Sequence, residues 1–188
     1  MLAFAPMKSL TGAAPLTLAC HPRTPSEAIE AIEVSVGVVP GDTLSLAFVL
    51  HCDLSRLRIP APRSSARADG LWRHTCFEAF VMVGEGPGYR EFNFSPSGQW
   101  AVYGFRGYRD GGQRDAGVAP RIVVRRTPHR LELVAQIDRD FRPGGRPLWL
   151  GLSAVVEDAG GALSYWALQH PAGKPDFHHA DSFTLQLP

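Results

Sequence analysis

The sequence predicts an all-β fold, a two-sheet antiparallel β-sandwich of jelly-roll or immunoglobulin-like type with about nine to eleven strands. Two observations lead to this prediction. Apolar and polar residues alternate with a period of two in many short runs, which is the pattern of strands with one buried face. Glycine and proline supply 19 and 16 of the 188 residues, and this excess favours many turns over long helices.

The expected strands follow one another along the chain as hairpins. Residues 32–38 and 44–50 alternate on either side of Pro40-Gly41-Asp42, where proline fixes one dihedral angle and glycine permits positive φ. Similar turn residues separate the later runs. The other expected strands are residues 76–83, 89–95, 99–106, 121–126, 130–137, 149–157, 162–170 and 183–187.

Three other segments have a different pattern. Residues 59–70 and 107–119 are rich in turn-forming and charged residues, so we expect two long loops there. Residues 24–27 have capping-box spacing with proline at the first helical position, which allows one turn of helix at most. No repeat and no linker composition is visible, so we expect a single domain over residues 1–188.

Composition argues against several functional classes. The net charge is +1 and the basic residues form no dense block, so we expect neither a nucleic-acid nor a membrane partner. No apolar run approaches the roughly 18 residues of a membrane helix, and no signal-peptide pattern is present, so a cytoplasmic location is expected. Three cysteines without CxxC spacing predict neither a disulfide framework nor structural zinc, and no cofactor is expected. The oligomeric state is not indicated.

Polar residues inside the central strands are the candidates for function. Glu78 interrupts an apolar run, and a buried carboxylate is unfavourable unless it has partners or faces an aqueous cleft. In the following runs Glu91 and Asn93 share one face, and Trp100 and Arg106 share another. If these strands are neighbours, polar groups and rings line one sheet face, which suits a sugar-like ligand. The alternative is a solvated outer face, with the aromatic residues turned to the core.

A second polar stretch leaves an enzyme as another alternative. His170, Asp176, His178 and His179 lie within ten residues and could supply metal ligands. However, adjacent strand residues such as His178 and His179 point apart, so one of them is expected to fix the loop by a hydrogen bond. The two central glutamates could instead act as general acid and base in glycoside cleavage. No GxSxG motif supports a serine hydrolase.

Five stretches of the chain carry a resemblance to a known family. They are Cys20-His21-Pro22 and residues 69–78, 89–100, 164–168 and 174–178. With these stretches the chain resembles the DOMON-like proteins, which are bacterial and related to DOMON domains and to family nine carbohydrate-binding modules. The resemblance covers about residues 16–187 and implies a two-sheet β-sandwich that holds a sugar or a haem on or beside one sheet.

The resemblance gives the two ligand classes different residues. For haem, Met82 is the internal candidate for an axial ligand. For a sugar, tryptophans would stack on the rings while polar side chains hold the hydroxyls. We expect a small polar, carbohydrate-like ligand, bound without catalysis, and a protein-interaction module is a further alternative. The expected ligand-binding residues are Trp72, Glu78, Glu91, Asn93, Trp100, Arg106, Trp166 and His178.

Overall fold

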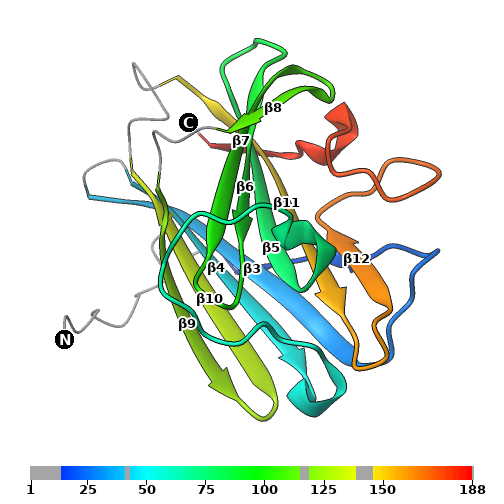
Figure 1. Cartoon of the computed structure of the whole chain (residues 1–188). Helices are drawn as coiled ribbons and strands as arrows, with labels where there is room; N and C mark the ends of the chain where they lie inside the picture. Colours follow the sequence, from blue (N-terminus) through cyan, green and yellow to red (C-terminus); the bar gives the residue numbers. More distant parts are fainter. Residues whose placement is uncertain (1–13, 41–42, 115–118, 139–145, 188) are drawn as a thin grey trace.

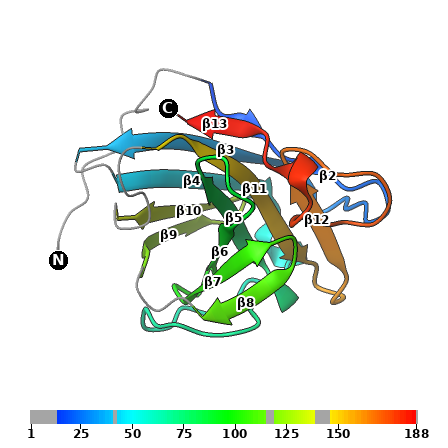
Figure 2. The ribbon, with the colours of Figure 1, turned by 90° about the horizontal axis from the view of Figure 1, so that it is seen from above.

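The alternating runs form strands of two antiparallel sheets that pack face to face (Figures 1 and 2), which confirms the predicted β-sandwich. The computed structural model describes residues 14–40, 43–114, 119–138 and 146–187. Thirteen strands occur in these residues. They include all ten that the alternation predicts, together with three short ones. No helix in the described part of the chain is long and apolar enough to span a membrane.

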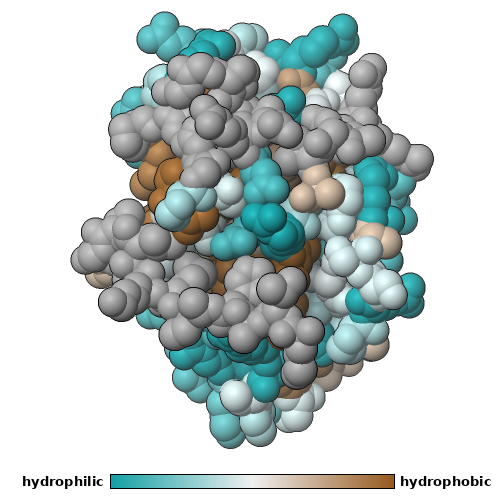
Figure 3. Space-filling view, turned by 90° about the vertical axis from the view of Figure 1, so that its left-hand side faces the viewer, coloured by the Kyte–Doolittle hydropathy of each residue, from teal (hydrophilic) through white to brown (hydrophobic). Residues whose placement is uncertain are grey.

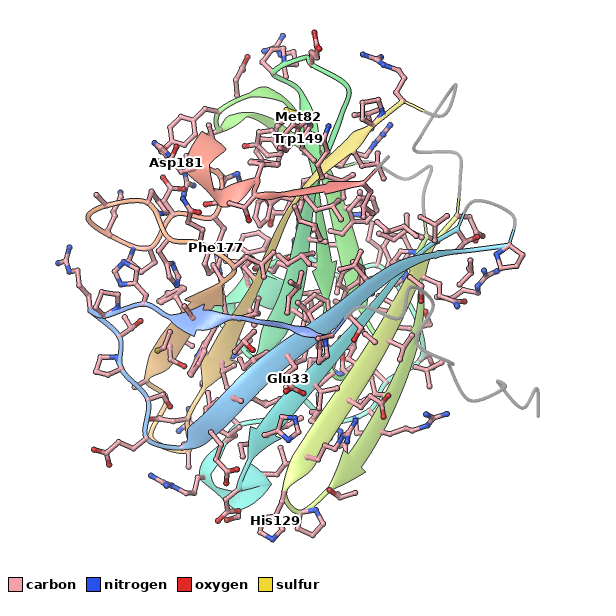
Figure 4. All side chains as sticks on the ribbon, turned by 180° about the vertical axis from the view of Figure 1, so that it is seen from behind. Glu33, Met82, His129, Trp149, Phe177 and Asp181 are labelled. Atoms are coloured by element: carbon pink, nitrogen blue, oxygen red, sulfur yellow. The ribbon has the colours of Figure 1, made fainter. Side chains whose placement is uncertain are left out.

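The first sheet has five strands, and the alternating hairpin at residues 32–50 lies at its centre. Its outer face carries polar side chains such as Glu33, labelled in Figure 4, which lies 3.1 Å from His51. The predicted turn residues Gly41 and Asp42 lie outside the described residues. In spatial order the strands are β1 (Leu16–Thr17), β3 (Ile29–Val39), β4 (Thr43–Cys52), β10 (Arg130–Ile137) and β9 (Arg121–Thr127).

The second sheet has eight strands and contains the three central runs as direct neighbours. Their antiparallel pairing is continuous from β11 through β5 and β6 to β7. In spatial order the strands are β2 (Ala19–Cys20), β12 (Leu163–Ala167), β11 (Leu148–Glu157), β5 (Cys76–Val83), β6 (Tyr89–Phe94), β7 (Trp100–Gly107) and β8 (Asp110–Arg114), and β13 (Leu185–Leu187) pairs with β11.

One local prediction needs correction. Residues 107–119 are not a continuous loop, because β8 folds back on β7 as a hairpin. Gly111 and Gly112 adopt positive φ, and at Gly111 a Cβ would lie 2.7 Å from the Gly104 carbonyl oxygen, so the glycines that suggested a loop belong to an irregular ladder. At residues 24–27 no helix forms; the Thr24 amide donates to the His21 carbonyl, and its hydroxyl accepts from the Tyr165 amide.

The main core lies between the sheets and is built from every second residue of each strand. Phe77 of β5 and Phe48 of β4 are fully buried, and their rings lie 5.1 Å apart across the sandwich. The side view in Figure 3 shows apolar atoms near mid-height and hydrophilic atoms toward both ends. Because strand side chains alternate, the remaining residues of β5, β6, β7 and β11 point away from this core.

That outer face of the eight-stranded sheet is not simply solvated. Residues 168–184, here called the cover segment, run from β12 to β13 across it (orange to red in Figure 1). Phe177 and Phe183 of this segment join Phe80 in a second apolar cluster. The segment approaches the sheet most closely at Gly151, where a Cβ would lie 2.9 Å from the Ser182 carbonyl oxygen. The outer face of this sheet is therefore not an open surface, because a cavity lies between the sheet and the cover segment.

Candidate functional site

The register of the central strands brings the in-strand polar residues together. Glu78 on β5 lies opposite Asn93 on β6 and opposite Ser153 on β11. Glu91 lies opposite Phe80 on one side and Tyr103 on the other. Glu78 and Glu91 are therefore diagonal neighbours on one sheet face, close enough for their carboxyl groups to interact.

A pocket of about 410 Å³ opens over these two glutamates. This volume lies within the roughly 300–1,000 Å³ of small-molecule sites. Its floor comes from the sheet, and its walls come from the cover segment, the β7–β8 turn and the short helix η2 (Leu71–Arg73). The lining residues are Trp72, Glu78, Phe80, Glu91, Tyr103, Phe105, Arg109, Gly112, Val155, Tyr165, Pro175, Asp176, Phe177 and His178.

The two glutamates are buried and held by neutral hydrogen-bond donors. Asn93 Nδ2 donates to Glu91 Oε1 at 2.7 Å, and Ser153 Oγ donates to Glu78 Oε2 at 3.3 Å. Burial raises the pKa of Glu78 well above its usual value, and the nearby Glu91 raises it further. Burial also raises the pKa of Glu91, but the Asn93 hydrogen bond and the charge of Arg109 oppose that rise. We therefore expect Glu78 to hold a proton more tightly than Glu91.

His178 connects the cover segment to this pair. Its Nδ1 lies 2.8 Å from the Tyr89 hydroxyl, and its Nε2 lies 3.6 Å from Glu91 Oε2. The Tyr89 hydroxyl also accepts the Arg109 backbone N–H, so its own proton is available for Nδ1. Nε2 would then carry the ring hydrogen and face Glu91. Burial lowers the pKa of His178 to about 4, with a smaller effect from Arg109, so the ring is neutral near pH 7.

Asp176 joins the cover segment to the β7–β8 turn. Its carboxylate accepts hydrogen bonds from the Tyr108 hydroxyl, from Arg109 Nη2 at 2.7 Å and from the His178 backbone N–H at 3.2 Å. Burial alone would raise the pKa of Asp176, but the hydrogen bonds from Tyr108 and Arg109 outweigh it and lower the pKa. Figure 4 shows the next residue, Phe177, on the cover segment below Asp181 of the short helix η5 (Ala180–Ser182).

Aromatic rings form much of the wall around the carboxyl groups. The Phe105 and His178 ring centroids lie 5.0 Å apart, and Phe80 approaches the same imidazole at 5.0 Å. Near the η2 wall, Trp72 packs edge-on against Tyr103 at 5.6 Å, and its side chain is 39% exposed. An exposed indole at a pocket wall is available for stacking on a ligand ring.

The structure brings half of the predicted binding residues to the pocket lining, namely Trp72, Glu78, Glu91 and His178. Asn93 lies behind Glu91, where it orients the carboxylate. Whether these residues contact a ligand stays a prediction.

The other three predicted residues do not line this pocket. Trp166 points into the main core, where its Nε1 donates to Ser164 Oγ at 2.9 Å. Trp100 packs against the same core from the opposite face of β7 to Tyr103. The Arg106 side chain is 83% exposed and pairs with Asp110 at 2.9 Å. These three residues therefore do not share the pocket surface with Glu78, because strand parity turns them away from it; a role in ligand binding for them stays a prediction.

The residues considered as metal or haem ligands have other contacts in the described part of the chain. Among the described residues, no group of three or more His, Cys, Asp or Glu side chains is arranged to hold a metal ion. His170 Nε2 lies 2.9 Å from the Ala19 carbonyl oxygen, and His179 Nδ1 accepts the Asp181 backbone N–H. His178 and His179 thus have separate roles, as expected. Met82 lies beside Trp149 on β11 (Figure 4), packed against the apolar cluster under the cover segment.

Several lining residues were not among the predicted ones. Tyr103 and Phe105 could have been found from the alternation, which places them on the face opposite Trp100, had the β6–β7 register been known. Arg109 and Asp176 meet only because the β7–β8 turn contacts the cover segment, which lies 67 positions away in sequence. No local pattern predicts that contact.

Comparisons with known proteins concern the fold. No family model matches the chain, and no curated protein matches it. One similar solved structure is described as a "putative carbohydrate-binding protein" from Bacteroides uniformis, with a TM-score of 0.68, 15% identity, and 90% of this chain and 82% of that chain covered. Another is a family nine carbohydrate-binding module from Caldicellulosiruptor kristjanssonii in complex with cellotriose, with a TM-score of 0.55, 9% identity, and 85% and 74% coverage. The chain therefore shares its β-sandwich fold with these two structures.

Proposed function

We propose that the pocket under the cover segment binds a small polyhydroxylated ligand of the carbohydrate class, without catalysis. The observation that carries this proposal is a pocket in which two buried carboxyl groups lie among aromatic rings. Carboxyl groups bind hydroxyls, and flat rings stack on the C–H faces of sugars. A pocket of this kind favours a small ligand over a protein-interaction surface.

The fold comparisons support the same proposal. One of the two solved structures is described as a "putative carbohydrate-binding protein", and the other is a carbohydrate-binding module in complex with cellotriose. We extend the proposal to membership of the DOMON-like group, for which the sequence stretches around Glu78 and Glu91 are the support.

Each polar group has a distinct role in the proposed complex. Glu91, held by Asn93 Nδ2 at 2.7 Å, accepts a hydrogen bond from a ligand hydroxyl. Glu78, diagonal to Glu91 on the same sheet face, forms a hydrogen bond with a second polar group of the ligand. His178, neutral near pH 7, offers its Nε2 on the same side as Glu91. Trp72 stacks on the ligand ring at the pocket wall, where it is exposed.

Isothermal titration calorimetry tests the proposal, after a glycan array has selected the sugars. Glu91→Gln removes a charged acceptor, and we expect affinity to fall by about tenfold to hundredfold. Trp72→Ala removes the stacking surface and should weaken binding by about tenfold. Trp100→Ala is the matched tryptophan control, because Trp100 lies on the core side of β7. Thermal unfolding confirms that each variant is folded.

The outcomes separate the proposal from its alternatives. Sugar binding that is lost in Trp72→Ala and kept in Trp100→Ala supports the pocket. Absence of binding by the wild type to every sugar on the array refutes it. Chromatography of the sugars after incubation shows whether any glycosidic bond is cleaved. If the wild type cleaves a sugar and Glu78→Gln does not, the protein is a glycoside hydrolase and the proposed binding role without catalysis is wrong.

A further inference from the structure

Among the described residues, no arginine or lysine forms an ion pair with either carboxyl group of the pocket. Arg109, the basic side chain of the lining, is committed to Asp176 at 2.7 Å. In the part of the chain that the structure describes, His178 is the basic group that lies nearest to ion-pair distance, with its Nε2 3.6 Å from Glu91 Oε2. Its imidazole is neutral near pH 7. Glu78 is 2% exposed and receives its hydrogen bond from the neutral Ser153. Arg109 and Asp176 balance each other's charge. The two carboxyl groups of Glu78 and Glu91 then remain in the pocket lining without a balancing positive charge.

The other charged and titratable groups around the pair do not balance it. Tyr103, on β7, donates to Asp69, and Arg67 also pairs with Asp69 at 2.7 Å. The Cys76 thiol lies behind the pair and donates to Asn93 Oδ1, and burial raises its pKa well above the usual value. These groups are thus neutral or internally paired, so they supply no cation to the two glutamates.

The walls of the pocket suit a cation as well as a sugar ring. Phe80, Phe105, Tyr165 and Phe177 surround the carboxyl groups from β5, β7, β12 and the cover segment. The faces of aromatic rings attract ammonium groups, and cages of such rings beside a carboxylate recognise organic cations. A neutral sugar can form hydrogen bonds with the buried acid pair, but it supplies no positive charge to balance the pair.

We propose that the ligand carries a protonated amine that binds between Glu78 and Glu91, so that the preferred ligand is an amino sugar rather than a neutral sugar. This inference rests on the proposed function for the hydroxyl-bearing part of the ligand. In the free protein a proton shared by the two carboxyl groups reduces their repulsion. The ammonium group displaces that proton into solvent, so binding releases up to about one proton per ligand.

Calorimetry with a matched set of probes tests the inference. The probes are D-glucose, D-glucosamine and N-acetyl-D-glucosamine, the corresponding galactose and mannose series, and cyclohexylamine, which has the ring and the ammonium group but no hydroxyls. Titrations at about pH 6.5 keep the amines protonated. Repeating them in buffers of different ionisation enthalpy gives the number of protons released.

We expect the free amino sugar to bind about tenfold to hundredfold more tightly than its neutral parent and its N-acetyl derivative. We also expect proton release with the amine alone. Glu91→Gln and Glu78→Gln should each bring the amine-to-neutral affinity ratio close to one. The matched control is Glu85→Gln, an exposed glutamate between β5 and β6, which should leave the ratio unchanged. Because the ratio is measured within each variant, a general loss of affinity does not imitate the effect.

The two proposals fail in different ways. Neutral sugars that bind as tightly as amino sugars overturn the inference and support the proposed function. Binding of cyclohexylamine as strong as that of the amino sugars supports a cation site and overturns a role for the hydroxyls. Absence of binding by every probe overturns both proposals.

Discussion

Replacing Glu78 by glutamine should change how the stability of the protein depends on pH. Glu78 is fully buried under the pocket, and its pKa is raised well above the usual value, first by burial and then by Glu91. The folded state thus holds this proton more tightly than the unfolded state does. Stability is therefore lost as pH rises from the ordinary carboxyl range through the folded pKa. A glutamine side chain cannot ionise, so the variant lacks this loss.

The size of the effect follows from the number of protons involved. We assign one retained proton to the pair, because Asn93 and Arg109 favour the ionised form of Glu91. One proton changes the free energy of unfolding by at most about 1.4 kcal/mol per pH unit. Between about pH 5 and pH 7, wild type should thus lose up to about 2.7 kcal/mol relative to Glu78→Gln.

His178 produces a slope of the opposite sign in part of this range. Its pKa is lowered from 6.5 to about 4 by burial and by Arg109, so the unfolded state binds this proton first. Stability is therefore lost as pH falls from about 6.5 to about 4. The quantity to measure is the difference between wild type and Glu78→Gln, in which the contribution of His178 cancels.

Urea unfolding at a series of pH values between about 5 and 8 gives the free energies, with the m-value checked for constancy. The control is Glu85→Gln, which removes an exposed carboxyl group from the turn between β5 and β6. Curves for wild type and Glu78→Gln that stay parallel over the whole range would refute the reasoning. They would show that Glu78 is as readily ionised in the folded protein as in the unfolded chain.

Three further substitutions test the packing around the site. Phe77→Ala empties a fully buried position between the sheets and should lower the free energy of urea unfolding by about 3–5 kcal/mol. Gly151→Ala places a Cβ 2.9 Å from the Ser182 carbonyl oxygen, so the cover segment should shift outward. The effect on ligand affinity, measured by calorimetry, should be larger than the effect on thermal stability. Asp176→Asn weakens the contact with Arg109 at 2.7 Å and should speed limited proteolysis within residues 168–184, whereas unchanged cleavage would show that other contacts hold the segment.

The strands were predictable because each carries its own signal. The alternation at residues 32–50 predicts β3 and β4, and the run at Cys76–Val83 is β5 with the same bounds. It also places Glu78 on the face opposite the core-forming Phe77. Strand β8 was not predicted, because its glycines are typical of a loop. In the structure these glycines have positive φ and lie close to β7.

The candidate site was predictable only in part. Glu78 and Glu91 stood out because a carboxylate inside an apolar strand is unfavourable without a local reason. Trp100 and Trp166 were assigned to the site by residue type, yet strand parity points both toward the sandwich core. Residue type alone does not say which face of a sheet is the ligand face.

The sequence by itself determined the class of fold and the unusual positions within it, because period-two alternation and turn residues act over a few neighbouring residues. Only the tertiary structure decided that Glu78 and Glu91 lie at the floor of a pocket. That arrangement depends on the cover segment, which meets the β7–β8 turn through Asp176 and Arg109. Such a contact between distant segments is selected by packing and charge pairing in the folded chain, and no local sequence pattern encodes it.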